Sequence, residues 1–330
     1  MRETGKLIYN AYGDEEPVYG LIEDNTGKII NPYEKKEALL DWHTSFARMQ
    51  EIAESWKEVY PYQDETAVNL NRITEYPRLP YLIYWGSDWH IGNVDTRYEE
   101  LKKDIRLITT TPNCGVVTVG DDIDNGIMPK FEVRFMQTSP PMVQAFTMAS
   151  LIDELNGNNP RRKQTILAHV IGNHTHTMME TTGQVFEKYY ERSKAAILPG
   201  IGRLGITLGK QSYEIALAHR YVGTSRLNVT LCAKRLMEYV YPDADVAVVG
   251  HSHVSAHEKF KKGGMWHTAV RPGTYRVGTG LFEHARSYSS GDIGGSCTIF
   301  YPDKHDALTF DRLEEGIDYL QNIFVVKGVK

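Results

Sequence analysis

The stretch GSDWHIGN, residues 86–93, places Asp88 and His90 two positions apart, where an apolar run ends in glycine. In a strand, residues i and i+2 point to the same face, so both side chains can aim at one point beyond the strand's end. A carboxylate oxygen and an imidazole nitrogen that converge there suit a divalent metal ion. A polar turn that caps a helix would produce the same short pattern, so this motif alone leaves both interpretations open.

The same kind of pattern recurs after four later apolar runs. Each run is followed by side chains with oxygen or nitrogen ligands, namely Asp121, Asn173 with His174, His219, and His251 with His253. A single tetrahedral zinc needs only four ligands, whereas this number suits two ions about 3.5–4 Å apart with a bridging carboxylate. Five such motifs, each closing a predicted strand, are hard to explain as ordinary core histidines. The set therefore predicts a two-metal site.

The elements that must position these motifs are short strands that alternate with helices. From residue 81 on, the buried strands are predicted at YLIYWGSD, CGVVTVGDD, TILAHVIGN, YEIALAH and DVAVVGHSH, and the helices at TRYEELKKDIRLI and NVTLCAKRLMEYVYP. Such alternation is typical of a layered α/β architecture, in which functional groups collect at the carboxyl ends of the strands. Residues 126–160 are long for one connection and predict a helical insertion near the site.

The first 80 residues differ in pattern from the rest of the chain. Residues 34–60 carry apolar side chains at spacings of three and four, which predicts one long amphipathic helix. That helix could pack on its own domain, or contact a second copy or another protein. We expect an accessory segment with this helical extension over residues 1–80 and a catalytic domain over residues 81–330.

Composition narrows the class of protein. The 330 residues allow a large core, and the formal net charge of −5 gives no global attraction to nucleic acid or to an anionic membrane. Three widely separated cysteines fit a reduced compartment. We find no secretory signal and no apolar run near the ~18 residues of a membrane helix. The expectation is a cytoplasmic protein without a membrane partner.

In their order, the motifs Asp-x-His, Gly-Asp-x-x-Asp, Gly-Asn-His, a lone His and Gly-His-x-His resemble those of the calcineurin-like metallophosphoesterase superfamily, over residues 81 to about 300. The resemblance implies a four-layer sandwich, in which two mixed β-sheets pack face to face between helices. It also implies a dinuclear site at the sheet ends. Histidine-rich, carboxylate-bridged sites accept manganese, iron, zinc or nickel, and we expect two divalent ions, with manganese first among these.

The resemblance also implies a role for each motif residue. The implied ligands are Asp88, His90 and His253 for the first ion, Asn173, His219 and His251 for the second, and Asp121 as the bridge. His174 would stabilise or protonate the leaving oxygen, and Asp124 would orient that histidine. His169 lies inside an apolar run and is expected to be a core histidine, not a ligand.

The sequence departs from the family's pattern at two positions. Thr175 stands where an acidic residue often follows Gly-Asn-His, and Asn125 stands where the family's protein phosphatases carry a phosphate-binding arginine. Both departures argue against a protein phosphatase. We expect Asn125, His176 and Arg276 to contact the substrate; a polar loop position is the alternative for His176, and a surface salt bridge for Arg276.

The expected activity follows from two cations at a phosphate centre. They would neutralise its oxygens and lower the pKa of bound water toward neutrality. We expect a phosphodiesterase in which a metal-bridging hydroxide attacks a diester of nucleic acid, DNA or RNA, or of nucleotides, in the manner of the nucleases of the family, whose phage-encoded and bacterial members have a similar layout. A metal-dependent phosphomonoesterase is one alternative. A scaffold or binding protein on a phosphoesterase fold is the other.

Overall fold

The structure is a computed structural model of the chain. It describes residues 64–125, 136–157, 164–176, 187–225, 227–278 and 292–328, with short pieces before residue 64. The chain divides into two compact units, Met1–Pro61 and Tyr62–Lys330.

The first unit is described in short pieces only. Its strands form two antiparallel pairs, β1 (Leu7–Tyr9) with β2 (Glu15–Pro17) and β3 (Ile22–Glu23) with β4 (Ile29–Ile30). Phe46, Ala47 and Gln50 are helical, and the single long helix expected over residues 34–60 stays a prediction. The remaining residues of that predicted helix lie outside the described residues.

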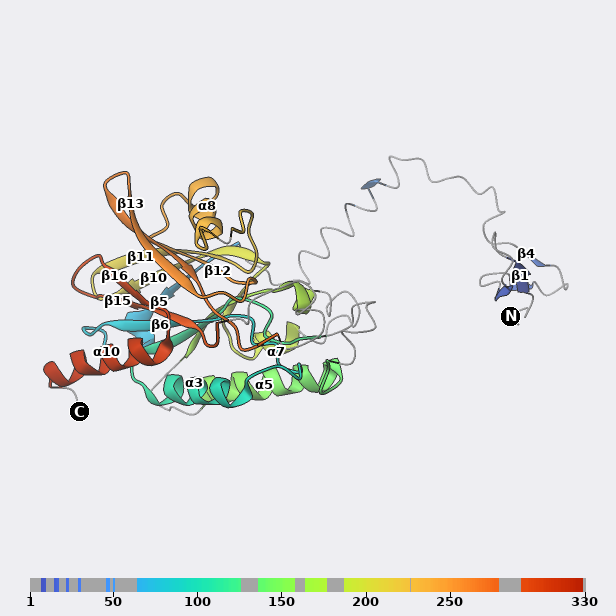
Figure 1. Ribbon diagram of the computed structural model, residues 1–330, viewed down its shortest axis with the longest axis horizontal. Coiled ribbons are helices and arrows are strands. Elements are labelled where there is room, and N and C mark those ends of the chain that lie inside the picture. The colour runs from blue at the N-terminus through green and yellow to red at the C-terminus, as the bar shows by residue number, and fades with distance from the viewer. Residues whose placement is uncertain are drawn as a thin grey trace. The chain divides into compact units, whose positions relative to one another are not determined.

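The second unit contains two six-stranded mixed sheets (Figure 1). The first sheet has the order β16-β15-β6-β7-β8-β9. Its strands are β6 (Tyr81–Gly86), β7 (Cys114–Thr118), β8 (Ile166–Val170), β9 (Ala196–Leu198), β15 (Ser296–Phe300) and β16 (Ala307–Phe310). Strands β6 to β9 pair in parallel, and β15 and β16 extend the sheet in antiparallel pairing.

The second sheet has the order β13-β14-β12-β11-β10-β5. Its strands are β5 (Glu65–Asn69), β10 (Ile201–Leu208), β11 (Gln211–Ala218), β12 (Val246–Val249), β13 (Ala256–Lys262) and β14 (Met265–Arg271). Strands β11, β12 and β14 pair in parallel, as do β5 and β10, whereas β10 pairs antiparallel with β11 and β13 with β14.

The core lies between the two sheets. Every residue of β6, β7 and β8 is buried, as expected for parallel strands that are covered on both faces, which explains their nearly continuous apolar sequences. One buried cluster joins Trp85 and Val117 of the first sheet to Leu217 and Val248 of the second. By contrast, the side chains of β10 alternate between buried and half-exposed positions.

Helices cover the outer faces of both sheets (Figure 1). Their bounds are α2 (Leu70–Ile73), α3 (Tyr98–Thr110), α5 (Pro141–Gly157), α7 (Glu187–Glu191), α8 (Leu231–Tyr239) and α10 (Leu313–Val326). Helices α3, α5 and α10 contact the first sheet, and α8 contacts the second. The predicted four-layer sandwich is therefore confirmed, and α5 lies within the helical insertion expected over residues 126–160. None of the helices in the described ranges is long and apolar enough to span a membrane.

The domain boundary expected between residues 80 and 81 lies inside the second unit. Strand β5 pairs in parallel with β10, from Glu65 opposite Arg203 to Asn69 opposite Thr207. Leu70, which follows directly, is fully buried in the core between the sheets. A five-residue strand at the edge of a sheet carries too little periodicity to be distinguished from a loop in the sequence.

Candidate metal centre

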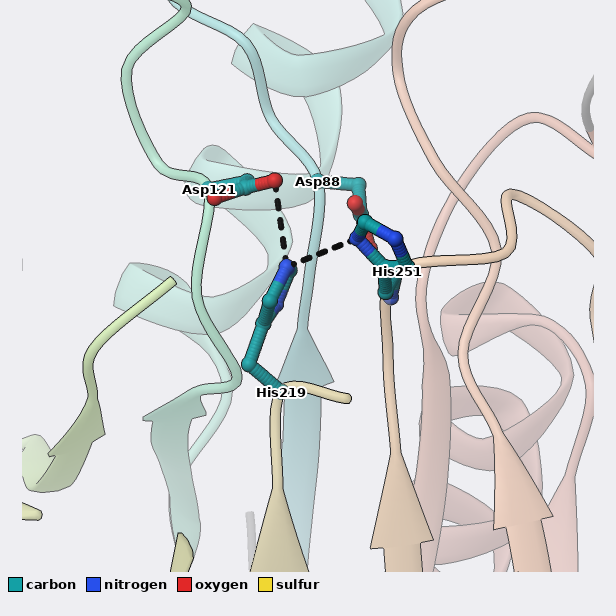
Figure 2. A group of neighbouring side chains, drawn as sticks. All are labelled: Asp88, Asp121, His219 and His251. Atoms are coloured by element: carbon teal, nitrogen blue, oxygen red, sulfur yellow. Dashed lines mark hydrogen bonds and ion pairs between the residues drawn. The ribbon is translucent and has the colours of Figure 1, made fainter. Parts of the chain in front are cut away.

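The five motifs meet where the strands of the two sheets end. The motif residues are Asp88 and His90 after β6, Asp121 after β7, Asn173 after β8, His219 after β11, and His251 and His253 after β12. Strands β6, β7 and β8 run in parallel, and so do β11 and β12, so their carboxyl ends bring these side chains together. Figure 2 shows four of the residues gathered around one point.

His219 is at the centre of one group of ligands. Its Nδ1 donates to the carbonyl oxygen of Val119 at 2.8 Å, so its Nε2 is the nitrogen left for a ligand role. That Nε2 lies 3.1 Å from Oδ2 of Asp121, 3.0 Å from Oδ1 of Asn173 and 3.1 Å from Nδ1 of His251. The four residues whose ligand atoms all lie within 4.8 Å of one another are Asp88, Asp121, His219 and His251.

His90 is at the centre of a second group. Its Nδ1 bonds to Oδ1 of Asp124 at 2.8 Å, which again leaves Nε2 facing the other ligands. This Nε2 lies 3.1 Å from Nε2 of His253 and 3.7 Å from Oδ1 of Asp88. The Nε2 of His253 is 3.2 Å from the same oxygen. Asp88 therefore belongs to both groups, whereas the bridging role expected for Asp121 stays a prediction.

Asp88 has one oxygen free for a ligand. Its Oδ2 accepts the backbone N–H of His251 at 2.9 Å and the hydroxyl of Ser87. Its Oδ1 is buried and accepts no hydrogen bond of good geometry among the described residues, although Nε2 of His253 lies 3.2 Å away. Burying a carboxylate oxygen without a hydrogen bond costs free energy unless a cation pairs with it.

Carboxylates next to the two central histidines raise the pKa of both rings, so each group favours positive charge. Burial opposes protonation of His219, but the nearby Asp121 carboxylate outweighs it and raises the histidine pKa to about 9. Burial likewise opposes protonation of His90, and its hydrogen bond to Asp124 raises the pKa to about 9. In both places the raised pKa favours a proton on a nitrogen that points at carboxylate and imidazole atoms. A divalent cation would replace that proton, so the residues fit metal ions.

His174 lies beside these groups and is held by the main chain. Its backbone N–H donates to Oδ1 of Asp121 at 2.9 Å, and its Nδ1 bonds to the carbonyl oxygen of Asp124. Its Nε2 lies 3.9 Å from Oδ2 of Asp121, and the side chain is 18% exposed. The ring is thus anchored through Nδ1, while Nε2 stays next to the ligands. A third possible ligand group consists of His90, Asp124 and His174.

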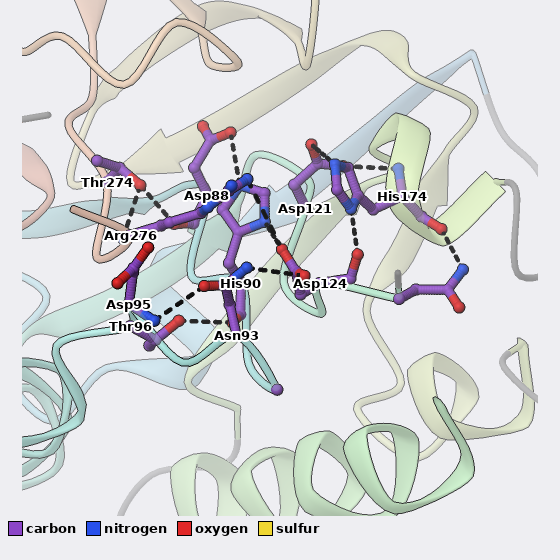
Figure 3. A network of polar contacts seen from close by, with 12 residues as sticks. Asp88, His90, Asn93, Asp95, Thr96, Asp121, Asp124, His174, Thr274 and Arg276 are labelled. Atoms are coloured by element: carbon purple, nitrogen blue, oxygen red, sulfur yellow. Dashed lines mark hydrogen bonds and ion pairs between the residues drawn. The ribbon is translucent and has the colours of Figure 1, made fainter. Parts of the chain in front are cut away.

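Asp124 contacts both histidines, but through different atoms (Figure 3). Its side-chain Oδ1 bonds to His90 and its Oδ2 accepts from Nδ2 of Asn93 at 2.9 Å. Only its backbone carbonyl bonds to His174. We expected this carboxylate to orient His174; it bonds to the candidate ligand His90 instead, because the turn after β7 directs the side chain toward the loop after β6.

The three residues expected to contact the substrate differ in environment. Asn125 is 2% exposed, and its Nδ2 donates to the carbonyl of His174 at 2.8 Å, so it supports that histidine from behind and is not placed for substrate contact. His176 is exposed and lines a cavity beside the His219 group. Nη1 of Arg276 lies 4.0 Å from Oδ1 of Asp124, at the edge of the His90 group.

The backbone at the site adopts an unusual conformation. Of the eight non-glycine residues with positive φ angles in the described ranges, six lie at the site, namely Asp88 (52°), His90 (47°), Asp121 (53°), Asn125 (40°), His251 (70°) and His253 (59°). This left-handed conformation costs a non-glycine residue about 1–2 kcal/mol, and it persists where surrounding contacts enforce it. Here the N–H groups of Asp88 and His90 donate to the carbonyls of Gly120 and Asp121, both at 3.0 Å. Backbone strain therefore falls on five of the seven candidate ligands and on Asn125.

The glycine of the Gly-Asn-His motif allows close approach of two strand ends. A Cβ on Gly172 would lie 2.2 Å from the backbone N and from Oδ1 of Asp121. No side chain can occupy that space.

Sequence reasoning did not single out Asn93, which bonds to Asp124, or Thr274, whose hydroxyl donates to the carbonyl of Asp88 at 2.8 Å. Both residues lie within stretches next to the motifs, and only that proximity in the sequence could have indicated that they belong to the site.

The chain is similar to several solved structures at low sequence identity. One is a conserved uncharacterized protein of Streptococcus pneumoniae, described as a predicted phosphoesterase, at 15% identity and TM-score 0.30 over 71% of this chain and 98% of that one. A second is Vacuolar Protein Sorting 29 from Cryptosporidium parvum, at 14% identity and TM-score 0.34 over 70% of this chain and 97% of that one. A third is nuclease MPE from Pseudomonas putida, at 11% identity and TM-score 0.33 over 69% of this chain and 87% of that one. No family model and no curated protein matches. The residue roles therefore depend on this chain's own geometry.

Proposed function

We propose that the protein is a dinuclear metal-dependent phosphodiesterase that acts on nucleic acid or nucleotides. The observation that carries this proposal is the pair of ligand groups around His90 and His219, which share Asp88. Carboxylate, amide and imidazole atoms face one another there, and the histidine Nδ1 protons are already bound elsewhere. A motif set used only for packing would not place so many acceptors around two points.

Bound metal ions would neutralise the phosphate oxygens and activate a water molecule. The chain's own residues supply the orientation and the proton. Asp124 and the carbonyl of Val119 hold His90 and His219 with Nε2 toward the ligand groups. The Asp124 carbonyl holds Nδ1 of His174, so a protonated His174 presents its Nε2–H to the leaving oxygen.

We propose manganese as the resident ion, because the ligand set mixes hard carboxylate and amide oxygens with imidazole nitrogens. Iron, zinc and nickel suit the same atoms. The preference for a diester over a monoester rests on His90, the histidine of the first motif, which the family's diesterases keep. The side chain of His90 is 1% exposed. Its Nδ1 bonds to Asp124, and its Nε2 lies next to His253.

The test is hydrolysis of bis(p-nitrophenyl) phosphate beside p-nitrophenyl phosphate, with manganese added to metal-stripped protein. We expect a manganese-dependent preference for the diester that is lost in Asp121→Ala. A matched control is Asp311→Ala, which removes an exposed carboxylate that also pairs with a histidine. A preference for the monoester would replace the proposal with a phosphatase. Tight metal binding without turnover of either ester would favour a binding protein.

A further inference from the structure

A cavity of about 510 Å³ adjoins the metal centre on the side of Asn173 and His219, both of which line it. Its volume falls within the ~300–1,000 Å³ that is usual for small-molecule sites. Because ligand side chains form part of its wall, a phosphate held at the His219 group would place one of its ester arms in this space. The cavity is therefore a candidate for the part of the substrate that is not the phosphate.

The wall away from the ligands is largely apolar. The connection from β9 to β10 passes from one sheet to the other through Pro199 and Gly200. Pro199 and Ile201 line the cavity there, and Tyr221 lines it two residues after His219. Ile201 and Tyr221 also pack against the buried cluster beneath α8, which restrains them. A restrained wall of proline, aliphatic and aromatic side chains suits a flat, mostly uncharged ring.

The same turn links the cavity to the ligands. The backbone N–H of His219 donates to the carbonyl of Gly200 at 2.9 Å. The N–H of Ile171 donates to the carbonyl of Leu198, also at 2.9 Å. Gly200 has a φ of 86°, a conformation that favours glycine. The cavity wall and the ligand His219 are thus held in one arrangement, so a group in the cavity has a defined position relative to the metal centre.

Arg220 places positive charge at this cavity, which it lines. Its side chain is exposed, and no carboxylate of the described ranges forms an ion pair with it. A guanidinium group in such a place can bind a phosphate with two parallel hydrogen bonds. The cavity therefore combines a surface for a ring with a site for an anion, next to the position of the scissile phosphate.

We propose that this cavity binds one nucleoside unit of the substrate, with the base against Tyr221, Pro199 and Ile201 and with Arg220 near an adjoining phosphate. This inference rests on the proposed phosphodiesterase function and names the part of the substrate that the enzyme recognises. A base stacked on an aromatic side chain loses about tenfold or more in affinity when that side chain is removed.

The first experiment compares two diesters that release the same p-nitrophenol, thymidine 5′-(p-nitrophenyl phosphate) and methyl p-nitrophenyl phosphate, with the manganese-loaded full chain. We expect kcat/KM to be about tenfold or more higher for the thymidine ester. Tyr221→Ala should remove most of that advantage and leave methyl ester hydrolysis nearly unchanged, whereas Tyr221→Phe should retain the advantage. Val222→Ala, which truncates the exposed neighbouring side chain, is the control.

Equal rates for the two esters, unaffected by Tyr221→Ala, would overturn the inference and leave the phosphodiesterase proposal intact. Absence of turnover for both esters would count against the phosphodiesterase proposal itself. In that event binding of adenosine 5′-monophosphate, followed by calorimetry, tests the cavity independently. Weaker binding in Tyr221→Ala and in Arg220→Gln would support the inference, and unchanged binding in both would overturn it.

Discussion

His90 and Asp124 form a buried hydrogen bond of 2.8 Å between Nδ1 and Oδ1, and His257 and Asp311 form one of the same length and atom types at the surface. The buried pair is 1% exposed on each side, whereas the other pair is 33% and 50% exposed. Only His90 has its second nitrogen among other ligands. The first pair therefore orients the ring of a candidate metal ligand, and the second provides a natural control.

Asp124→Asn should weaken metal binding about 10–100-fold, because the group that fixes the tautomer and direction of His90 is changed while its shape is kept. Calorimetric titration of manganese into metal-stripped protein measures this. Asp311→Asn changes the matching surface pair and should leave the affinity as it is. Equal affinities in both variants would show that Asp124 does not act through His90.

His174→Gln should lower kcat about 10²–10⁴-fold while manganese still binds, because His174 contacts Asp121 through its backbone N–H and supplies a proton through its ring. Activity and metal content are measured on the same sample. His305→Gln, which changes an exposed histidine in the β15–β16 connection, should retain full activity. A parallel loss of metal in His174→Gln would instead assign His174 to the ligands.

Gly172→Ala should abolish metal binding and destabilise the metal-free protein by about 1–3 kcal/mol, because the added Cβ would collide with the backbone of Asp121. Urea unfolding and manganese titration test both parts. Gly157→Ala is the matched substitution, since a Cβ at the end of α5 meets nothing within 4 Å. That variant should be as stable as the parent or slightly more so. Normal metal binding by Gly172→Ala would contradict the close approach of the two strand ends.

Acid should destabilise the protein through His169. The side chain is fully buried, its nitrogens lie 2.8 Å and 2.9 Å from the hydroxyls of Thr118 and Ser193, and burial lowers its pKa to about 3. The unfolded chain takes up a proton near pH 6.5 that the folded chain does not accept. The stability from this group is therefore complete above pH ~6.5 and falls by about 1.4 kcal/mol per unit as the pH drops toward 3.

The variant His169→Gln should flatten this dependence. Its free energy of unfolding in urea should change less between pH 6 and pH 4 than that of the parent protein, even if its stability at pH 7 is lower. His305→Gln, with an exposed histidine, should retain the parent's slope. A slope in His169→Gln as steep as the parent's would mean that other groups control the acid response.

The residue types of the candidate ligands, their order and their place after strands could be predicted from the sequence, and the structure brings these side chains into groups that could hold metal ions. The burial of His169, predicted from its apolar surroundings, is confirmed as well. These features are local, because a strand and the residues that directly follow it are adjacent along the chain.

Other features of the site depend on contacts between residues far apart in the sequence, and only the tertiary structure shows them. Asp124 orients His90, 34 positions away, and not His174 as expected. Asn125 is buried against His174, and β5 joins β10 across more than a hundred residues. The cavity beside His219 forms where the two sheets meet. Sequence periodicity records which face of an element is buried, but the direction of each side chain across a turn depends on packing and on the strained backbone at the site.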